Sequence, residues 1–151
     1  MDFIKHIKFG DVMVLDNPLI PHKLELIDTA YRLKPFRSFA DLGACWGVNG
    51  GYSFHTRSLC GQNFDQGYIV DQTITPLTTE RALKFNDLKL TPAMLGSTKA
   101  REAVGKVDTL IMFDILLHQV APDWDQFIGE WLPYTDTVIV YNQNWFKSKK
   151  P

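Results

Sequence analysis

The chain has 151 residues, of which 45% are hydrophobic and 22% are charged, and its formal net charge is −1. This length is typical of a single domain with a buried core, and the composition is that of an ordinary globular protein. Nucleic-acid-binding proteins usually carry a concentrated basic surface, so the balanced charge does not favour nucleic acid as a partner. Cys45 and Cys60 are too few for a disulfide framework or a zinc site, and we expect free thiols.

Nothing in the sequence indicates a membrane segment. The first residues scatter charges through a short apolar stretch and do not form the apolar core of a signal peptide. The longest apolar run, 109–117, is too short to span a bilayer and carries Asp114 in its middle. We therefore expect a cytoplasmic protein with no membrane contact.

The spacing of apolar residues and the turn signals predict the elements in chain order. Residues 1–20 mix short apolar runs with Gly-Asp and Asp-Asn-Pro turn signals, which indicates irregular structure or a short hairpin. A leading helix is predicted over 21–33, because apolar residues recur there at helical spacing and Pro35 follows. Beyond it, short apolar strands alternate with helical segments. The predicted strands are 38–42, 67–70, 88–90, 107–113 and 137–141, and the predicted helices are 47–59, 78–85, 99–104 and 124–132.

This alternation predicts an α/β fold. Strands joined by helices form right-handed crossovers, and these build a parallel sheet covered on both faces. We predict a doubly wound, mainly parallel five-stranded sheet in a domain over 37–151, preceded by an N-terminal segment over 1–36. Ligands of such sheets bind beyond the carboxyl ends of the strands, near the point where the strand order reverses. The residues that follow each strand are therefore the candidate site residues.

A glycine-rich turn, DLGACWG at 41–47, follows the first predicted strand. Gly43 and Gly47 allow a sharp turn and a close approach to a ligand, and the next helix would point free N–H groups at that ligand. A dinucleotide-binding turn has glycine where Cys45 stands here. Asp41 would repel a pyrophosphate but attract a cationic amine. This combination favours a ligand with an amino-acid end.

The same turn resembles the acid-x-Gly-x-Gly-x-Gly loop of class I, Rossmann-like S-adenosylmethionine-dependent methyltransferases, with Cys45 in place of the middle glycine. In that family the loop wraps the methionine part of the cofactor. The resemblance implies that Asp41, Gly43, Cys45 and Gly47 hold this part and that Trp46 shapes the outer wall of the loop. The alternative is a tight turn that binds no ligand.

Asp71 directly follows the second predicted strand and lies 24 residues beyond Gly47. This is close to the spacing of about 20 at which an acid meets ribose hydroxyls in nucleotide-binding folds. A carboxylate can accept two hydrogen bonds from a cis-diol, and methyltransferases of this class have an acid in the same place. The alternative role for Asp71 is that of a helix cap or turn residue.

The loop after the third predicted strand reads TPAMLG, at 91–96. In the family this loop covers the adenine, often with an Asp or Asn that accepts from the exocyclic amine. No such side chain stands here, so the resemblance implies that adenine rests on Ala93, Met94 and backbone groups. Core packing is the alternative for Met94.

The fourth predicted strand leads into FDILLHQVAPDW, at 113–124, which resembles the fourth motif of many small-molecule methyltransferases and implies a cofactor contact by Phe113. Methyl transfer needs a positioned acceptor and, for a hydroxyl or an amine, removal of a proton. Asp114 at the mouth of the site and His118 one turn further are therefore the candidate catalytic residues. The alternatives are structural capping for Asp114 and a capping or packed role for His118.

The fifth predicted strand bears on two further expectations. A metal-dependent branch of the family has an Asp-Asn pair after this strand, where this chain has Tyr141 and Asn142, so too few anionic oxygens remain for magnesium and we expect no metal. The family's domain normally continues with two more strands, and we expect one of three reasons for their absence here: a natural short form, a fragment of a longer protein, or a chain whose segment 1–20 replaces the missing edge. In the first two cases the free flank of 137–141 is expected to associate with a second copy or with a partner chain.

These patterns predict methyl transfer from S-adenosylmethionine, with S-adenosylhomocysteine as product and a small molecule as the favoured acceptor. The alternative is a non-catalytic module that binds either compound and acts with a partner chain. A nucleotide-binding oxidoreductase is a third hypothesis, against which Asp41 and Cys45 both argue.

Overall fold

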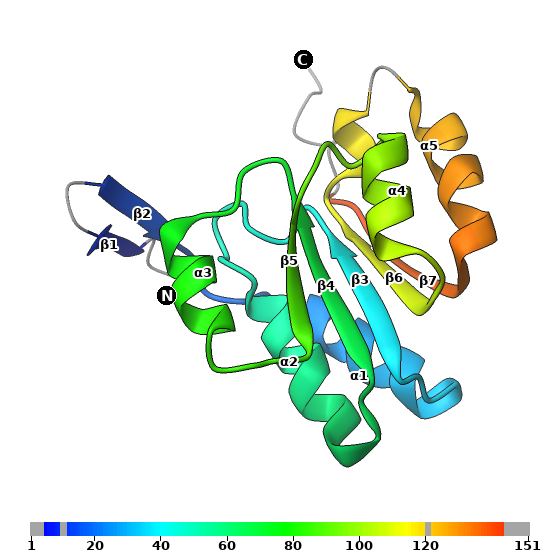
Figure 1. The fold of residues 1–151 in the computed structure, drawn as a ribbon, viewed down its shortest axis with the longest axis horizontal. Helices are drawn as coiled ribbons and strands as arrows, with labels where there is room; N and C mark the ends of the chain where they lie inside the picture. The colour runs from blue at the N-terminus through cyan, green and yellow to red at the C-terminus, as the bar shows by residue number, and fades with distance from the viewer. Residues whose placement is uncertain (1–4, 10–11, 120–121, 144–151) are drawn as a thin grey trace.

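The main sheet has five parallel strands in the order β5-β4-β3-β6-β7, as seen in the computed structural model (Figure 1). The structure describes residues 5–9, 12–119 and 122–143. The strands are β3 (Ser38–Leu42), β4 (Gln66–Asp71), β5 (Leu88–Pro92), β6 (Val107–Phe113) and β7 (Thr135–Tyr141). The prediction of a doubly wound five-stranded α/β sheet is confirmed, and within the described residues the sheet is parallel throughout.

Helices cover both faces of this sheet. Side chains alternate along each strand, so Phe39 packs into one hydrophobic cluster while Ala40 and Leu42 pack into another. The first cluster takes residues from α1 (Pro21–Leu33), α2 (Gly51–Cys60) and α3 (Pro76–Ala82), and the second from α4 (Thr98–Val104) and α5 (Trp124–Trp131). Short 3₁₀ turns are η1 (Gly61–Asn63), η2 (Leu116–His118) and η3 (Leu132–Tyr134).

The predicted helix over 47–59 begins later than expected, because α2 starts at Gly51. Gly47 and Gly50 adopt φ angles of +71° and +79°, which a right-handed helix does not contain. The backbone N–H of Gly50 donates to the carbonyl of Ala44, so the chain closes a turn before the helix begins. The glycine-rich turn therefore extends to Gly50, whereas the apolar pattern predicted a helix from residue 47.

The segment before α1 forms a hairpin, which was one of the two structures expected for it. β1 (Lys5–Phe9) and β2 (Val12–Asp16) pair antiparallel in a separate two-stranded sheet. The buried Asn49 side chain donates from Nδ2 to the carbonyl of Leu15 at 2.7 Å, and the backbone N–H of Asn17 donates to the carbonyl of Gly47 at 2.6 Å. The end of the hairpin thus braces the glycine-rich turn.

The strand order reverses between β3 and β6, since the chain proceeds from β3 to β4 and β5 on one side and to β6 and β7 on the other. The loops that follow β3 and β6 leave in opposite directions and open a crevice at the carboxyl ends of the strands. Helix α1 packs against α2 and β7, with Ile27 fully buried. Its first turn reaches the same end of the sheet, since Lys23 bonds Asp114, which directly follows β6.

Candidate functional site

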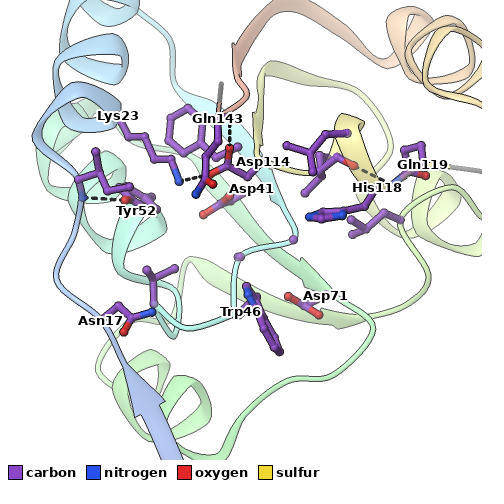
Figure 2. Close-up of a pocket in the computed structure, with 18 of the residues that line it drawn as sticks. Asn17, Lys23, Asp41, Trp46, Tyr52, Asp71, Asp114, His118, Gln119 and Gln143 are labelled. Atoms are coloured by element: carbon purple, nitrogen blue, oxygen red, sulfur yellow. Dashed lines mark hydrogen bonds and ion pairs between the residues drawn. The ribbon is translucent and has the colours of Figure 1, made fainter. Parts of the chain in front are cut away.

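A cavity of about 620 Å³ lies at the carboxyl ends of β3, β4 and β6 (Figure 2). This volume is within the range of small-ligand sites. Most of the residues predicted for the site line it, together with residues from α1, α2 and the hairpin end. The lining residues are Asn17, Pro18, Ile20, Lys23, Asp41, Gly43, Ala44, Trp46, Val48, Tyr52, Asp71, Leu95, Phe113, Asp114, Ile115, Leu117, His118, Gln119 and Gln143.

Asp41 is a buried carboxyl group at the floor of this cavity, with 2% of its surface exposed. Burial raises its pKa to about 7; the Ser53 hydrogen bond lowers that pKa, the Asp71 carboxylate raises it, and the Lys23 ammonium lowers it. The Ser53 hydroxyl donates to Oδ2 at 2.7 Å. A ligand cation next to Asp41 would stabilise its ionised form, which matches the cationic amine expected from the sequence.

Asp71 ends β4 and holds the glycine-rich turn. Its Oδ2 accepts from the backbone N–H of Cys45 at 2.9 Å, and its Oδ1 accepts from the backbone N–H of Thr73 at 3.1 Å. Gly43, at φ +77°, donates its N–H to the carbonyl of Val70 at 2.8 Å. The turn after β3 is therefore fixed to the end of β4, and the Asp71 carboxylate still lines the cavity.

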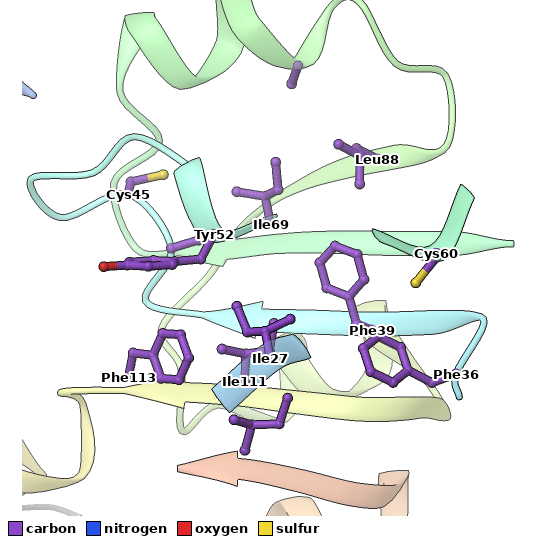
Figure 3. Close-up of a cluster of buried hydrophobic side chains, with 13 residues drawn as sticks. Ile27, Phe36, Phe39, Cys45, Tyr52, Cys60, Ile69, Leu88, Ile111 and Phe113 are labelled. Carbon is purple, nitrogen blue, oxygen red and sulfur yellow. The ribbon is translucent and has the colours of Figure 1, made fainter. Parts of the chain in front are cut away.

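The loop accommodates a side chain in place of its middle glycine because the Cys45 side chain points into the hydrophobic core. Its side chain is 1% exposed and belongs to the buried hydrophobic cluster, while its backbone N–H bonds Asp71 (Figure 3). Burial raises the pKa of the thiol to about 11, which keeps the thiol protonated and unreactive. Figure 3 shows Cys60 at the far end of the same cluster, and both cysteines are free. The middle position thus contributes its backbone to the site.

Three more residues that the sequence predicted to contact a cofactor, Trp46, Gly47 and Met94, differ in whether they line the cavity. Trp46 lines the cavity and is 86% exposed, so it stands at the rim. Gly47 and Met94 are outside the lining, and Met94 is 62% exposed. Leu95, which the sequence prediction missed, lines the cavity next to the position expected for Met94. The roles of these residues toward a cofactor stay predictions.

Asp114 is paired with a lysine that the sequence prediction missed. Lys23 Nζ lies 2.6 Å from Asp114 Oδ2, and Asp114 Oδ1 accepts from the backbone N–H of Gln143 at 2.8 Å. Asp114 adopts φ +56°, a left-handed backbone that is uncommon for a residue with a side chain. Both carboxylate oxygens thus accept hydrogen bonds, and Asp114 holds the Lys23 side chain and the Gln143 backbone in place. One signal for Lys23 exists in the sequence: it lies four residues before Ile27, on the buried face of the helix.

His118 lies in η2 on another side of the cavity, as Figure 2 shows. The residue is exposed, and its backbone N–H donates to the carbonyl of Ile115 at 3.1 Å. No side chain within the described ranges hydrogen-bonds its imidazole ring. The ring can therefore meet a molecule that enters the cavity. Phe113, at the end of β6, is buried and also faces the cavity.

Within residues 5–9, 12–119 and 122–143, no group of three or more His, Cys, Asp or Glu residues is placed to hold a metal ion. No helix in this part of the chain is long and apolar enough to cross a membrane.

Solved structures with a similar fold include proteins described as methyltransferases. The Pyrococcus horikoshii protein PH1948, provisionally described as an RNA methyltransferase, has a TM-score of 0.61 at 19% identity, over 84% of this chain and 63% of that protein. A Staphylococcus aureus protein, provisionally described as a caffeoyl-CoA O-methyltransferase, has a TM-score of 0.59 at 13% identity, over 79% of this chain and 55% of that one. The N-terminal domain of EvdMO1, solved in the presence of S-adenosylhomocysteine and D-fucose, has a TM-score of 0.61 at 10% identity, over 91% and 57%.

The chain thus has the fold of class I S-adenosylmethionine-dependent methyltransferases, and it spans 55% to 63% of the length of these three structures. The sequence itself matches no protein-family model and no curated protein. Identities of 10% to 19% bear on the fold alone. The function must therefore be argued from the residues of the cavity.

Proposed function

We propose that this chain binds S-adenosylmethionine in the cavity and transfers its methyl group to a small-molecule acceptor. The observation that carries the proposal is the convergence of Asp41 and Asp71 on one cavity at the switch point of the sheet. Asp41 is a buried carboxyl group that a cation would stabilise, and Asp71 is a carboxylate fixed by backbone amides. These two groups match the ammonium and the ribose hydroxyls of the cofactor.

The rest of the cavity suits the same ligand. A carboxylate has about four lone-pair sites, so Asp71 can accept from ribose hydroxyls while it holds Cys45 and Thr73. Leu95 and Ile115 add apolar surface on which a purine ring can rest. When bound, the cofactor supplies a methyl group already activated by its sulfonium.

Within the chain, His118 is the proposed base for a hydroxyl or amine acceptor. Its ring faces the cavity and is not held by another described side chain. Asp114 is proposed to act in positioning, because Lys23 and Gln143 occupy both of its oxygens. A small acceptor is supported by the net charge of −1 and by the size of the cavity.

Isothermal titration with S-adenosylmethionine, S-adenosylhomocysteine and NAD tests the proposal. We expect micromolar binding of the first two and none of NAD. Binding of NAD alone would support the oxidoreductase hypothesis, and no binding of any of the three would contradict a nucleoside site. With binding established, a screen for transfer of labelled methyl groups to hydroxyl- and amine-bearing small molecules and to RNA would identify the acceptor class.

A non-catalytic module is the second candidate, and the engaged Asp114 carboxylate favours it. Such a module would bind both nucleosides without turnover and act with a partner chain. Val140 on β7 is 40% exposed, and among the described strands β7 pairs only with β6. A dimer through this edge is therefore proposed, and a monomeric mass in light scattering at micromolar concentration would contradict it.

A further inference from the structure

Lys23 is a buried ammonium group at the cavity wall. Its side chain is 8% exposed, and Asp114 Oδ2 is its single hydrogen-bond acceptor among the residues that the structure describes. Three aromatic rings also lie near it, with Nζ 5.4, 5.6 and 5.3 Å from the ring centroids of Tyr52, Phe113 and Tyr141. An ammonium group carries three N–H donors, so Lys23 retains donors that no described oxygen accepts.

Such a group is costly to bury unless something in the cavity completes its hydrogen bonds. The aromatic rings compensate part of the lost hydration through cation–π attraction. Hydrogen bonds to water or to a ligand must supply the rest, since a buried charge with unused donors is destabilising. Because Lys23 lines the cavity, a ligand there can reach its free donors.

The carboxyl groups of Asp114 and Asp41 lie on the same side of the cavity as Lys23. Figure 2 shows the side chains of Lys23, Asp114 and Asp41 gathered together, with Trp46 and Asp71 on another side. Asp41 receives one side-chain hydrogen bond within the described part of the chain, from Ser53, and it also retains lone pairs for a ligand. Lys23 and Asp114 neutralise each other as a pair, so a ligand carboxylate at Nζ does not face an unpaired Asp114 charge.

We propose that Lys23 is the residue that recognises the carboxylate of the ligand's α-amino-acid group, while Asp41 accepts its ammonium. This inference rests on the proposed nucleoside ligand and adds a specificity to it: the site distinguishes nucleosides that carry a carboxylate from those that carry only an amine. Asp114 and the three rings hold the lysine in a largely buried position, where a charge-assisted hydrogen bond is stronger than in bulk water.

The test compares S-adenosylhomocysteine with the analogue that lacks only its carboxylate, by isothermal titration. The parent chain is expected to bind S-adenosylhomocysteine about 10- to 100-fold more tightly, the scale of a hydrogen bond between charged groups. Lys23→Met keeps the length and apolar contacts of the side chain but should reduce this preference to within about threefold, because a thioether has no charged donor for the carboxylate. Lys23→Arg should keep a clear preference.

Lys23→Met leaves Asp114 without its cation and can unfold the chain for that reason alone. The double variant Lys23→Met/Asp114→Asn removes both charges and should show the same loss of preference. Asp114→Asn alone should keep the preference, because Lys23 remains. The proposal is overturned if the parent binds both ligands equally, or if the folded variants without Lys23 retain the full preference. Failure of the parent to bind S-adenosylhomocysteine at all would refute the proposed function, and this inference with it.

Discussion

The carboxylate of Asp71, at the end of β4, accepts a 2.9 Å hydrogen bond from the backbone N–H of Cys45, in the turn after β3. The two residues are 26 positions apart in the chain. The bond joins the two loops that are proposed to contact the methionine and ribose parts of the cofactor. Asp71 therefore has a structural role as well as its proposed ligand role, and experiments must separate the two.

Asp71→Ala is expected to weaken binding of S-adenosylhomocysteine by about 1.5–3 kcal/mol, the scale of hydrogen bonds to a charged group. Isothermal titration measures this loss, and urea unfolding measures the cost of releasing the Cys45 amide. Asp65→Ala is the matched control, because Asp65 is an exposed acid that precedes β4 at the opposite end. If Asp71→Ala binds the ligand as tightly as the parent, the ribose assignment is wrong.

Asp41 should make the stability of the ligand-free chain fall as the pH rises. Its pKa is about 7 in the folded chain and 3.8 ordinarily, so between these values the folded state holds a proton that the unfolded state has lost. The free energy of unfolding then decreases by at most about 1.4 kcal/mol per pH unit over this window. Asp41→Asn cannot ionise, so its stability relative to the parent should increase between pH 5 and pH 8.

Urea unfolding of both chains at several pH values measures this difference and cancels the titration of all other groups. Asp65→Asn is again the control, because it makes the same substitution at an exposed carboxyl group outside the cavity. A difference for Asp41→Asn that is flat across this range would mean that Asp41 is ionised in the folded chain at acidic pH.

Local sequence patterns were sufficient to predict the sheet and to place two acids, Asp41 and Asp71, at the ends of its strands. A continuous apolar run predicts a buried strand, and parallel strands bring their carboxyl ends to one edge, so Asp41 and Asp71 could be placed together. The side-chain direction of Cys45 could not be predicted, because it depends on the left-handed backbone of Gly43 and Gly47 on either side.

Lys23 was missed for a different reason. Its partner Asp114 lies 91 positions away, and its rings come from α2, β6 and β7. Such an arrangement results from how α1 packs on the sheet. The spacing of Lys23 from Ile27 indicates the buried face of the helix but not the partners that Lys23 meets there. Leu95 was missed because Met94 and Leu95 have similar hydrophobicity, and only the loop geometry decides which of them faces the cavity.

Gly43→Ala should destabilise the chain by about 2–4 kcal/mol, from a left-handed backbone and from overpacking. The residue has φ +77°, and an added Cβ would lie 2.6 Å from Cγ2 of Ile115. Ile115→Ala removes that atom, so the double variant should be more stable than the two single effects predict. Urea unfolding of the four chains gives the coupling energy. Additivity within about 0.5 kcal/mol would show that Ile115 does not limit the space at Gly43.

Trp46 should report on ligand binding without contributing to stability. Because it is 86% exposed, Trp46→Phe is expected to change the free energy of unfolding by less than about 0.5 kcal/mol. Its position at the cavity rim means that S-adenosylhomocysteine should alter the tryptophan fluorescence of the parent chain. The Trp46→Phe variant should lose most of this signal.

Trp124→Phe is the matched control for this signal, since Trp124 is 54% exposed and does not line the cavity. It should keep the full fluorescence change. If Trp46→Phe keeps the change and Trp124→Phe loses it, the ligand binds away from the glycine-rich turn, and the cavity at the end of β3 is not its site. An unchanged affinity in Trp46→Phe would further show that the indole reports on the ligand without holding it.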